Sequence, residues 1–252
     1  MSPNALFILC PLLFVSGFID SIAGGGGLIA LTSYIAVGMP NLMALGTNKF
    51  SSACGTTIAV VRYSVKKQVI WKTAISAAIG AFIGSKLGSS AALLVDDRIF
   101  QYLMLILVPA ISVLTVLKKD FGEGNEEEIQ GTKALLLACL IGLVVGFYDG
   151  FFGPGAGMFL TLGFTAILKI DLSHASGNAR VVNLASNLAA LVTWIPNGYV
   201  DYSIAIPCAI CGIAGSYLGS GLAIKNGAKI IRPIMLVVIA LLLIKVALNL
   251  FG

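Results

Sequence analysis

Two basic residues lie inside long apolar stretches of the sequence, where a charged side chain needs a physical reason. Lys49 stands in the segment ALGTNKFSS and Arg180 in the segment ASGNARVVN. A lysine or arginine at the centre of a membrane helix costs ~2.5–3.5 kcal/mol on insertion scales. The two segments align when the two halves of the chain are superposed, so the same unfavourable charge occurs twice at one matched position.

Polar side chains follow each cation at helical spacing. They stand three and seven positions after the cation in both segments, on the same face of a helix. A cation flanked by hydroxyl and amide donors suits an anion that has several oxygen atoms. We therefore expect a substrate site for a small anion, formed by the following residues: Lys49, Arg180, Asn48, Ser52, Thr56, Asn178, Asn183 and Asn187.

Two acidic residues, Asp20 and Asp149, also occupy matched positions in the two halves. A buried carboxylate can neutralise a buried cation and so hold two helices together. It can also carry a proton if its charge partner is diverted during transport. Both roles remain open for Asp20 and Asp149: counter-ions of Lys49 and Arg180, or proton carriers.

Each acidic residue precedes a cluster of glycines, in GFIDSIAGGGGL and in GFYDGFFGPGAG. An apolar segment too short to span a bilayer follows each cluster, at 27–38 and 156–168. This order predicts a helix, an unwound turn and a half-helix whose free N–H groups and positive dipole end favour an anion. We expect Gly25, Gly26 and Gly155 to contribute to the anion site, although glycine also permits close helix packing.

The composition excludes a water-soluble protein. Of 252 residues, 58% are hydrophobic and 11% are charged, and the mean hydropathy is +0.98, whereas soluble domains carry about 25% charged residues. The net charge of +5 comes from residues in short connections, which indicates membrane orientation and not nucleic-acid binding. The five cysteines lie in apolar runs and there is one histidine, so no metal site, cofactor or disulfide framework is expected.

The chain is predicted to be an all-α, polytopic membrane protein made of two homologous halves, with broken or re-entrant helices at the glycine clusters. The first repeat is assigned to 1–117, a cytoplasmic linker to 118–132 and the second repeat to 133–252. Basic residues mark the connection after 42–61 as cytoplasmic, whereas the matched connection after 172–195 has none. This charge pattern predicts inverted repeats, and parallel repeats are the alternative.

At these motifs the sequence resembles the TauE/SafE family of sulfite exporters and toluene sulfonate uptake permeases. The resemblance rests on GFIDSIAGGGGL, GTNKFSS, YDGFFGPGAG and LGSGLAIKNGAKIIRPIM, and it extends over nearly the whole chain. It implies a multi-pass permease of the bacterial cytoplasmic membrane whose substrates are small sulfur-containing anions.

The predicted function is that of a secondary transporter working by alternating access on sulfite, a sulfonate or a related anion. An anion channel is the alternative. An enzyme is disfavoured because the sequence offers no nucleophile and base at credible spacing. The expected partners are the lipid bilayer, a small anionic substrate and a coupling proton, and the oligomeric state is left open.

Overall fold

The computed structural model describes residues 5–95 and 129–237, and these parts of the chain are helical with no β-strand. The predicted all-α class is therefore confirmed. Most of the predicted linker, 118–128, lies outside the described residues, as do 96–117 of the predicted first repeat and 238–252 of the second. The helices are α1 (Ala5–Ala23), α2 (Gly26–Ala36), α3 (Asn41–Val65), α4 (Trp71–Ala92), α6 (Gly131–Phe151), α7 (Ala156–Ala166), α8 (Leu172–Trp194) and α9 (Tyr202–Asn226).

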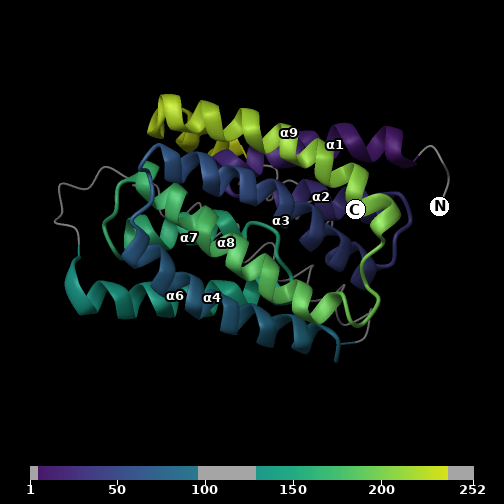
Figure 1. The fold of residues 1–252 in the computed structure, drawn as a ribbon, viewed down its shortest axis with the longest axis horizontal. Helices are drawn as coiled ribbons and strands as arrows, with labels where there is room; N and C mark the ends of the chain where they lie inside the picture. Colours follow the sequence, from purple (N-terminus) through teal and green to yellow (C-terminus); the bar gives the residue numbers. More distant parts are fainter. Residues whose placement is uncertain (1–4, 96–128, 238–252) are drawn as a thin grey trace, which may run out of the picture.

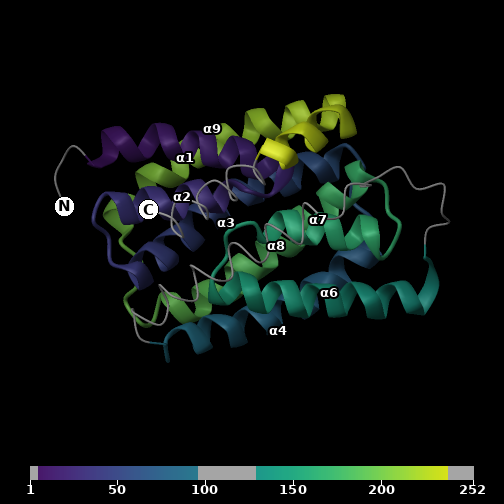
Figure 2. The same cartoon turned by 180° about the vertical axis from the view of Figure 1, so that it is seen from behind.

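The helices form three layers, each of which combines both halves of the chain (Figures 1 and 2). Helix α1 packs on α9, helix α6 packs on α4, and α3 and α8 lie between these outer pairs. The first and the fourth helix of each half therefore find their packing partner in the other half. Such an exchange makes the two halves interdependent, because neither outer pair forms without both.

The central helices α3 and α8 run antiparallel. Gly46 at the start of α3 lies against Tyr199, which follows α8, whereas Gly177 at the start of α8 lies against Gln68, which follows α3. Since α3 and α8 carry the matched cations, this is the relation that an inverted repeat requires. The orientation of the two halves across the membrane stays a prediction.

Glycines bring the outer helices into backbone contact. At each glycine in these contacts, an added methyl group would collide with a backbone carbonyl of the facing helix, so only a hydrogen atom fits there. Small residues at such spacing are typical of helix pairs that pack closely in membranes. They are Gly80, Gly84 and Gly88 on α4, Gly142 and Gly150 on α6, Gly17 on α1, and Gly215 and Gly219 on α9.

The distribution of side chains is that of a protein whose outer surface faces lipid. Within residues 5–95 and 129–237, three helices, α1, α6 and α9, are long and apolar enough to cross a membrane. Their outward positions carry large apolar side chains such as Phe7, Leu140 and Ile210, all more than half exposed. Most of the buried polar and charged side chains belong instead to the two central helices. The chain is a multi-pass membrane protein.

Two helices are broken at the glycine clusters, as the sequence predicts. Gly24 separates α1 from α2 with a φ of +81°, and Gly153 and Gly155 separate α6 from α7 with φ of +100° and +81°. Glycine adopts these left-handed angles without the steric cost of a Cβ atom. The half-helices α2 and α7 have 11 residues each, which corresponds to about 16 Å, half the thickness of a bilayer core.

Candidate anion site

Among the described residues, two ion pairs in the interior join the two halves of the chain. Lys49 Nζ of α3 lies 2.7 Å from Asp149 Oδ1 of α6, and Arg180 Nη1 of α8 lies 3.3 Å from Asp20 Oδ2 of α1. Arg180 Nη1 also donates to the Asp20 carbonyl oxygen at 2.5 Å. Each cation thus pairs with the carboxylate of the opposite half, not with that of its own.

The two pairs differ in how completely they are enclosed. The Lys49 and Asp149 side chains are each 3% exposed, and Asp149 Oδ2 also accepts a hydrogen bond of 2.5 Å from Ser186. The Arg180 side chain is fully buried, whereas that of Asp20 is 20% exposed. Asp149 therefore has both carboxylate oxygens engaged by protein donors, and Asp20 retains access to its surroundings.

A cavity lies between the two halves beside these pairs. About 20 Å³ of it is open to the centre of a water molecule, which is room for one water-sized group. Both broken helices and both central helices contribute to its wall. The lining residues are Asp20, Gly24, Gly27, Asn48, Lys49, Ser52, Asp149, Gly153, Gly155, Gly157, Asn183 and Asn187.

The predicted polar stripes converge on this cavity from α3 and α8. Asn48 and Ser52 line it from one helix, and Ser52 Oγ donates to Asn48 Oδ1 at 3.2 Å. Asn183 and Asn187 line it from the other, where Asn187 Nδ2 lies 3.4 Å from Asn183 Oδ1. Because the hydrogen bond between Asn183 and Asn187 is long, these two amides can turn toward a ligand in the cavity.

Arg180 lies behind the cavity wall and is not among the residues that line it. The backbones of Gly24 and Gly157 cover its guanidinium group, and a methyl group at Gly24 would lie 2.6 Å from Arg180 Nη2. Arg180 Nε and Nη2 are buried and have no hydrogen-bond acceptor among the described residues. A fully buried guanidinium with unused donors is costly, and an anion near the two glycines would reduce that cost.

The remaining predicted site residues occupy different places. Asn178 Oδ1 accepts a hydrogen bond of 2.8 Å from the Ile70 amide and so ties α8 to the start of α4. Gly25 is the N-cap residue of α2, and the Gly26 carbonyl accepts a hydrogen bond of 2.7 Å from Ser16 Oγ. Thr56 lines a neighbouring cavity instead. Gly155 lines the cavity between the two halves and is the N-cap residue of α7.

Sequence reasoning missed several residues of the site. Gly24, Gly27, Gly153 and Gly157 line the cavity, and their place in the glycine clusters was the signal that could have found them. Ser186, the hydrogen-bond donor to Asp149, stands one position before Asn187 and carries no signal that distinguishes it from other helical serines.

Comparison with known proteins identifies the family of the chain. The family model of the sulfite exporter TauE/SafE matches residues 9–246. The chain belongs to the TauE/SafE family. No solved structure matches the chain.

Curated members with similar sequences are named as transporters. The "Probable membrane transporter protein YfcA" of Escherichia coli (strain K12) is 34% identical over 248 residues, which cover 95% of this chain and 91% of that protein. A "Probable membrane transporter protein" of Haemophilus influenzae is 34% identical over 234 residues, 93% and 91% of the two chains. The "Probable membrane transporter protein ORF9" of Sinorhizobium sp is 32% identical over 225 residues, 89% and 85%. This TauE/SafE chain is accordingly a membrane transporter.

Proposed function

We propose that this TauE/SafE protein is a secondary transporter of the bacterial cytoplasmic membrane that moves a small oxyanion such as sulfite or a sulfonate. One observation carries the proposal: a cavity bounded by both half-helix starts lies beside Lys49 and Arg180, and each cation pairs across the two halves. Helix starts, a lysine and amide side chains together form a donor set suited to an anion with several oxygens.

The proposed substrate competes with the carboxylates for the cations. An oxyanion is larger than the water-sized space in the cavity, so its entry requires Lys49 to separate from Asp149. The unused N–H groups of Arg180 lie behind Gly24 and Gly157, close enough to attract the anion electrostatically through the glycine backbones. The family name suggests a sulfur-containing substrate. The donors themselves would equally accept another small oxyanion.

The crossed pairing supports transport by alternating access. Because each ion pair joins one half to the other, an anion that replaces a carboxylate loosens the contact between the halves at the site. The halves can then shift relative to each other and expose the cavity to the other side of the membrane. Transport of this kind couples the binding of substrate to the change of conformation.

The test is counterflow in proteoliposomes. Vesicles loaded with unlabelled sulfite are diluted into a trace of radiolabelled sulfite, and a carrier accumulates the label transiently above its equilibrium level. Sulfate, thiosulfate, sulfoacetate and acetate are compared as internal anions to define the substrate class. Rapid equilibration without a transient excess would assign an anion channel instead, and no flux above that of protein-free vesicles with any of these anions would overturn the proposal.

A further inference from the structure

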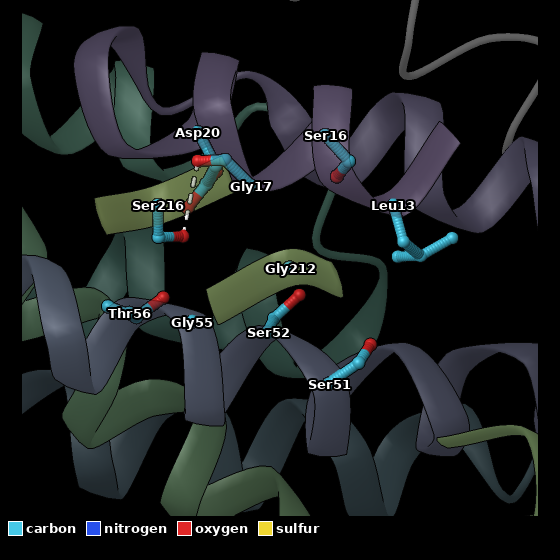
Figure 3. A pocket seen from close by; sticks show the side chains of 10 residues that line it. All are labelled: Leu13, Ser16, Gly17, Asp20, Ser51, Ser52, Gly55, Thr56, Gly212 and Ser216. Atoms are coloured by element: carbon cyan, nitrogen blue, oxygen red, sulfur yellow. Dashed lines mark hydrogen bonds between the residues drawn. The ribbon is translucent and has the colours of Figure 1, made fainter. Parts of the chain in front are cut away.

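A second cavity adjoins the anion cavity on the side of the first half. It lies between α1, α3 and α9, shares Asp20 and Ser52 with the anion cavity, and also offers about 20 Å³ to the centre of a water molecule. Figure 3 shows Ser52 and Thr56 on α3 facing Asp20 on α1 and Ser216 on α9 across this space. Its wall consists of Leu13, Ser16, Gly17, Asp20, Ser51, Ser52, Gly55, Thr56, Gly212 and Ser216.

The polar side chains of this wall present only oxygen atoms. Among the described residues they comprise the Asp20 carboxylate and five hydroxyl groups, with no lysine, arginine, histidine or amide side chain. Most of the hydroxyl protons are already directed elsewhere: Ser52 donates to Asn48 Oδ1, and Ser216 donates to the Gly17 carbonyl at 3.2 Å. Their free lone pairs are therefore the groups available to a ligand. Oxygen ligands including one carboxylate suit a hard cation.

Thr56 supplies an independent indication of a ligand. The residue is 3% exposed, its side chain lines the cavity, and its Oγ1 has no hydrogen-bond partner among the described residues. Threonines in helices usually satisfy this oxygen by bonding a carbonyl of the preceding turn, as the next residue, Thr57, does with Ala53 at 2.8 Å. The buried hydroxyl of Thr56 is thus left unpaired at the cavity, where a cation could bind it.

At several matched positions the described residues of the second half differ from those of this cavity wall. The repeat places Val145 opposite Ser16, and Ser186 opposite Gly55. The Ser186 hydroxyl donates directly to Asp149. The two carboxylates, equivalent in sequence, are therefore unequal in structure: Asp149 is closed off by Lys49 and Ser186, and Asp20 faces an oxygen-lined space.

We propose that this cavity binds a small monovalent metal cation, sodium, with Asp20, Ser52, Thr56 and Ser216 supplying oxygen ligands. Its coupling to the anion rests on the proposed function. The two ion pairs are neutral as a set, so an anion that enters alone leaves an uncompensated negative charge in a low-dielectric region. A sodium ion at Asp20 restores the balance and frees the charge of Arg180 to attract the anion through the glycine backbones.

The test measures thermal stability of the purified protein in detergent at constant ionic strength. Sodium chloride is exchanged stepwise for potassium chloride or choline chloride, with and without sulfite. We expect a saturable rise of Tm with sodium alone, and a larger rise with sulfite in sodium than in choline. The substitution Thr56→Val should weaken the apparent sodium affinity at least tenfold, and the neighbouring Thr57→Val, on the exposed face of α3, should leave it unchanged.

The two proposals fail separately. Equal Tm in all three salts, with stabilisation by sulfite retained, would overturn the sodium site and leave the anion site standing. Stabilisation by sodium without any effect of sulfite or the other anions would overturn the anion site and leave the sodium site standing. If Thr56→Val does not fold, Ser216→Ala replaces it, and unchanged sodium affinity in whichever variant folds would contradict the assigned ligands. Stabilisation that follows pH and ignores sodium would assign Asp20 to a proton and overturn the metal site.

Discussion

Lys49 of the first half and Asp149 of the second half form an ion pair of 2.7 Å that is almost completely enclosed. In the matched pair the second half supplies the cation, Arg180, and the first half supplies the carboxylate, Asp20. Charge pairing across the halves means that the centre of the transporter is also the contact between its two repeats. A substrate that alters the pairs therefore alters the relation between the halves.

The first prediction concerns the coupling of Lys49 to Asp149. Removing one partner of a buried ion pair leaves an uncompensated charge and costs about 3–5 kcal/mol. Lys49→Gln and Asp149→Asn should each lower stability strongly, and the double variant should lose much less than the sum. Thermal unfolding of the four proteins in the same detergent measures this difference, and strictly additive losses would show that the two side chains are not coupled.

The second prediction concerns the break between α1 and α2. Gly24 has a left-handed φ of +81°, and a methyl group there would meet both the Gly157 backbone and the Arg180 guanidinium. Gly24→Ala should therefore displace Arg180 and destabilise the protein by about 1–3 kcal/mol or more. Gly27→Ala is the matched control, because its nearest contact would be Pro154 Cα at 3.8 Å. Equal stability of the two variants in thermal unfolding would contradict this account of the glycine break.

The third prediction concerns the contact of α4 with α6. Gly84 lies against the backbone of Leu143 and Phe147, whereas its neighbour Ile83 is about half exposed on the outer surface. Gly84→Val should separate the two helices and abolish the folded protein, and Ile83→Val should be tolerated because lipid replaces the lost methylene contact. Yield of monodisperse protein after size-exclusion chromatography compares them, and a well-folded Gly84→Val protein would refute the close contact.

The fourth prediction concerns membrane orientation. Asn197 and Asn226 are exposed near opposite ends of α9: Asn197 precedes the helix, and Asn226 is its last residue. With inverted repeats, a single cysteine at 197 should react with an impermeant thiol reagent in intact cells, and one at 226 should react only after the cells are opened. A version without native cysteines provides the background. Labelling at 226 but not at 197 would support parallel repeats.

Sequence alone predicted the helices because apolar length decides where a chain can cross a bilayer. The helix α2 begins one residue before the predicted segment 27–38, and α7 begins where 156–168 does. The largest differences are at the polar ends, where α3 continues to Val65, beyond the predicted end at 61. Backbone hydrogen bonds keep a helix intact into the polar region, and hydropathy does not detect this extension.

The site was predictable only in part, because internal repetition identifies equivalent residues but not their partners. The repeat indicates that Lys49 corresponds to Arg180 and Asp20 to Asp149, and either pairing was compatible with it. Crossed pairing results from the exchange of outer helices between the halves, a tertiary feature. The same packing turns Asn178 toward the Ile70 amide, although its position beside Arg180 indicated a ligand. The unequal surroundings of Asp20 and Asp149 likewise depend on Ser186 and on helix α9.

The most direct test of the anion site is a binding titration with sulfite on the charge-neutral double variant Lys49→Gln/Asp149→Asn. This variant removes the lysine without leaving its carboxylate partner charged. A change in affinity therefore does not result from an unpaired carboxylate at the site. Lys86→Gln, at an exposed position of α4, is the control for the loss of a positive charge. Isothermal titration calorimetry in detergent should give a dissociation constant at least tenfold larger for the double variant than for the parent, and the parent value for Lys86→Gln. A double variant that is folded and binds sulfite with the affinity of the parent would contradict the assignment of Lys49 to the anion site.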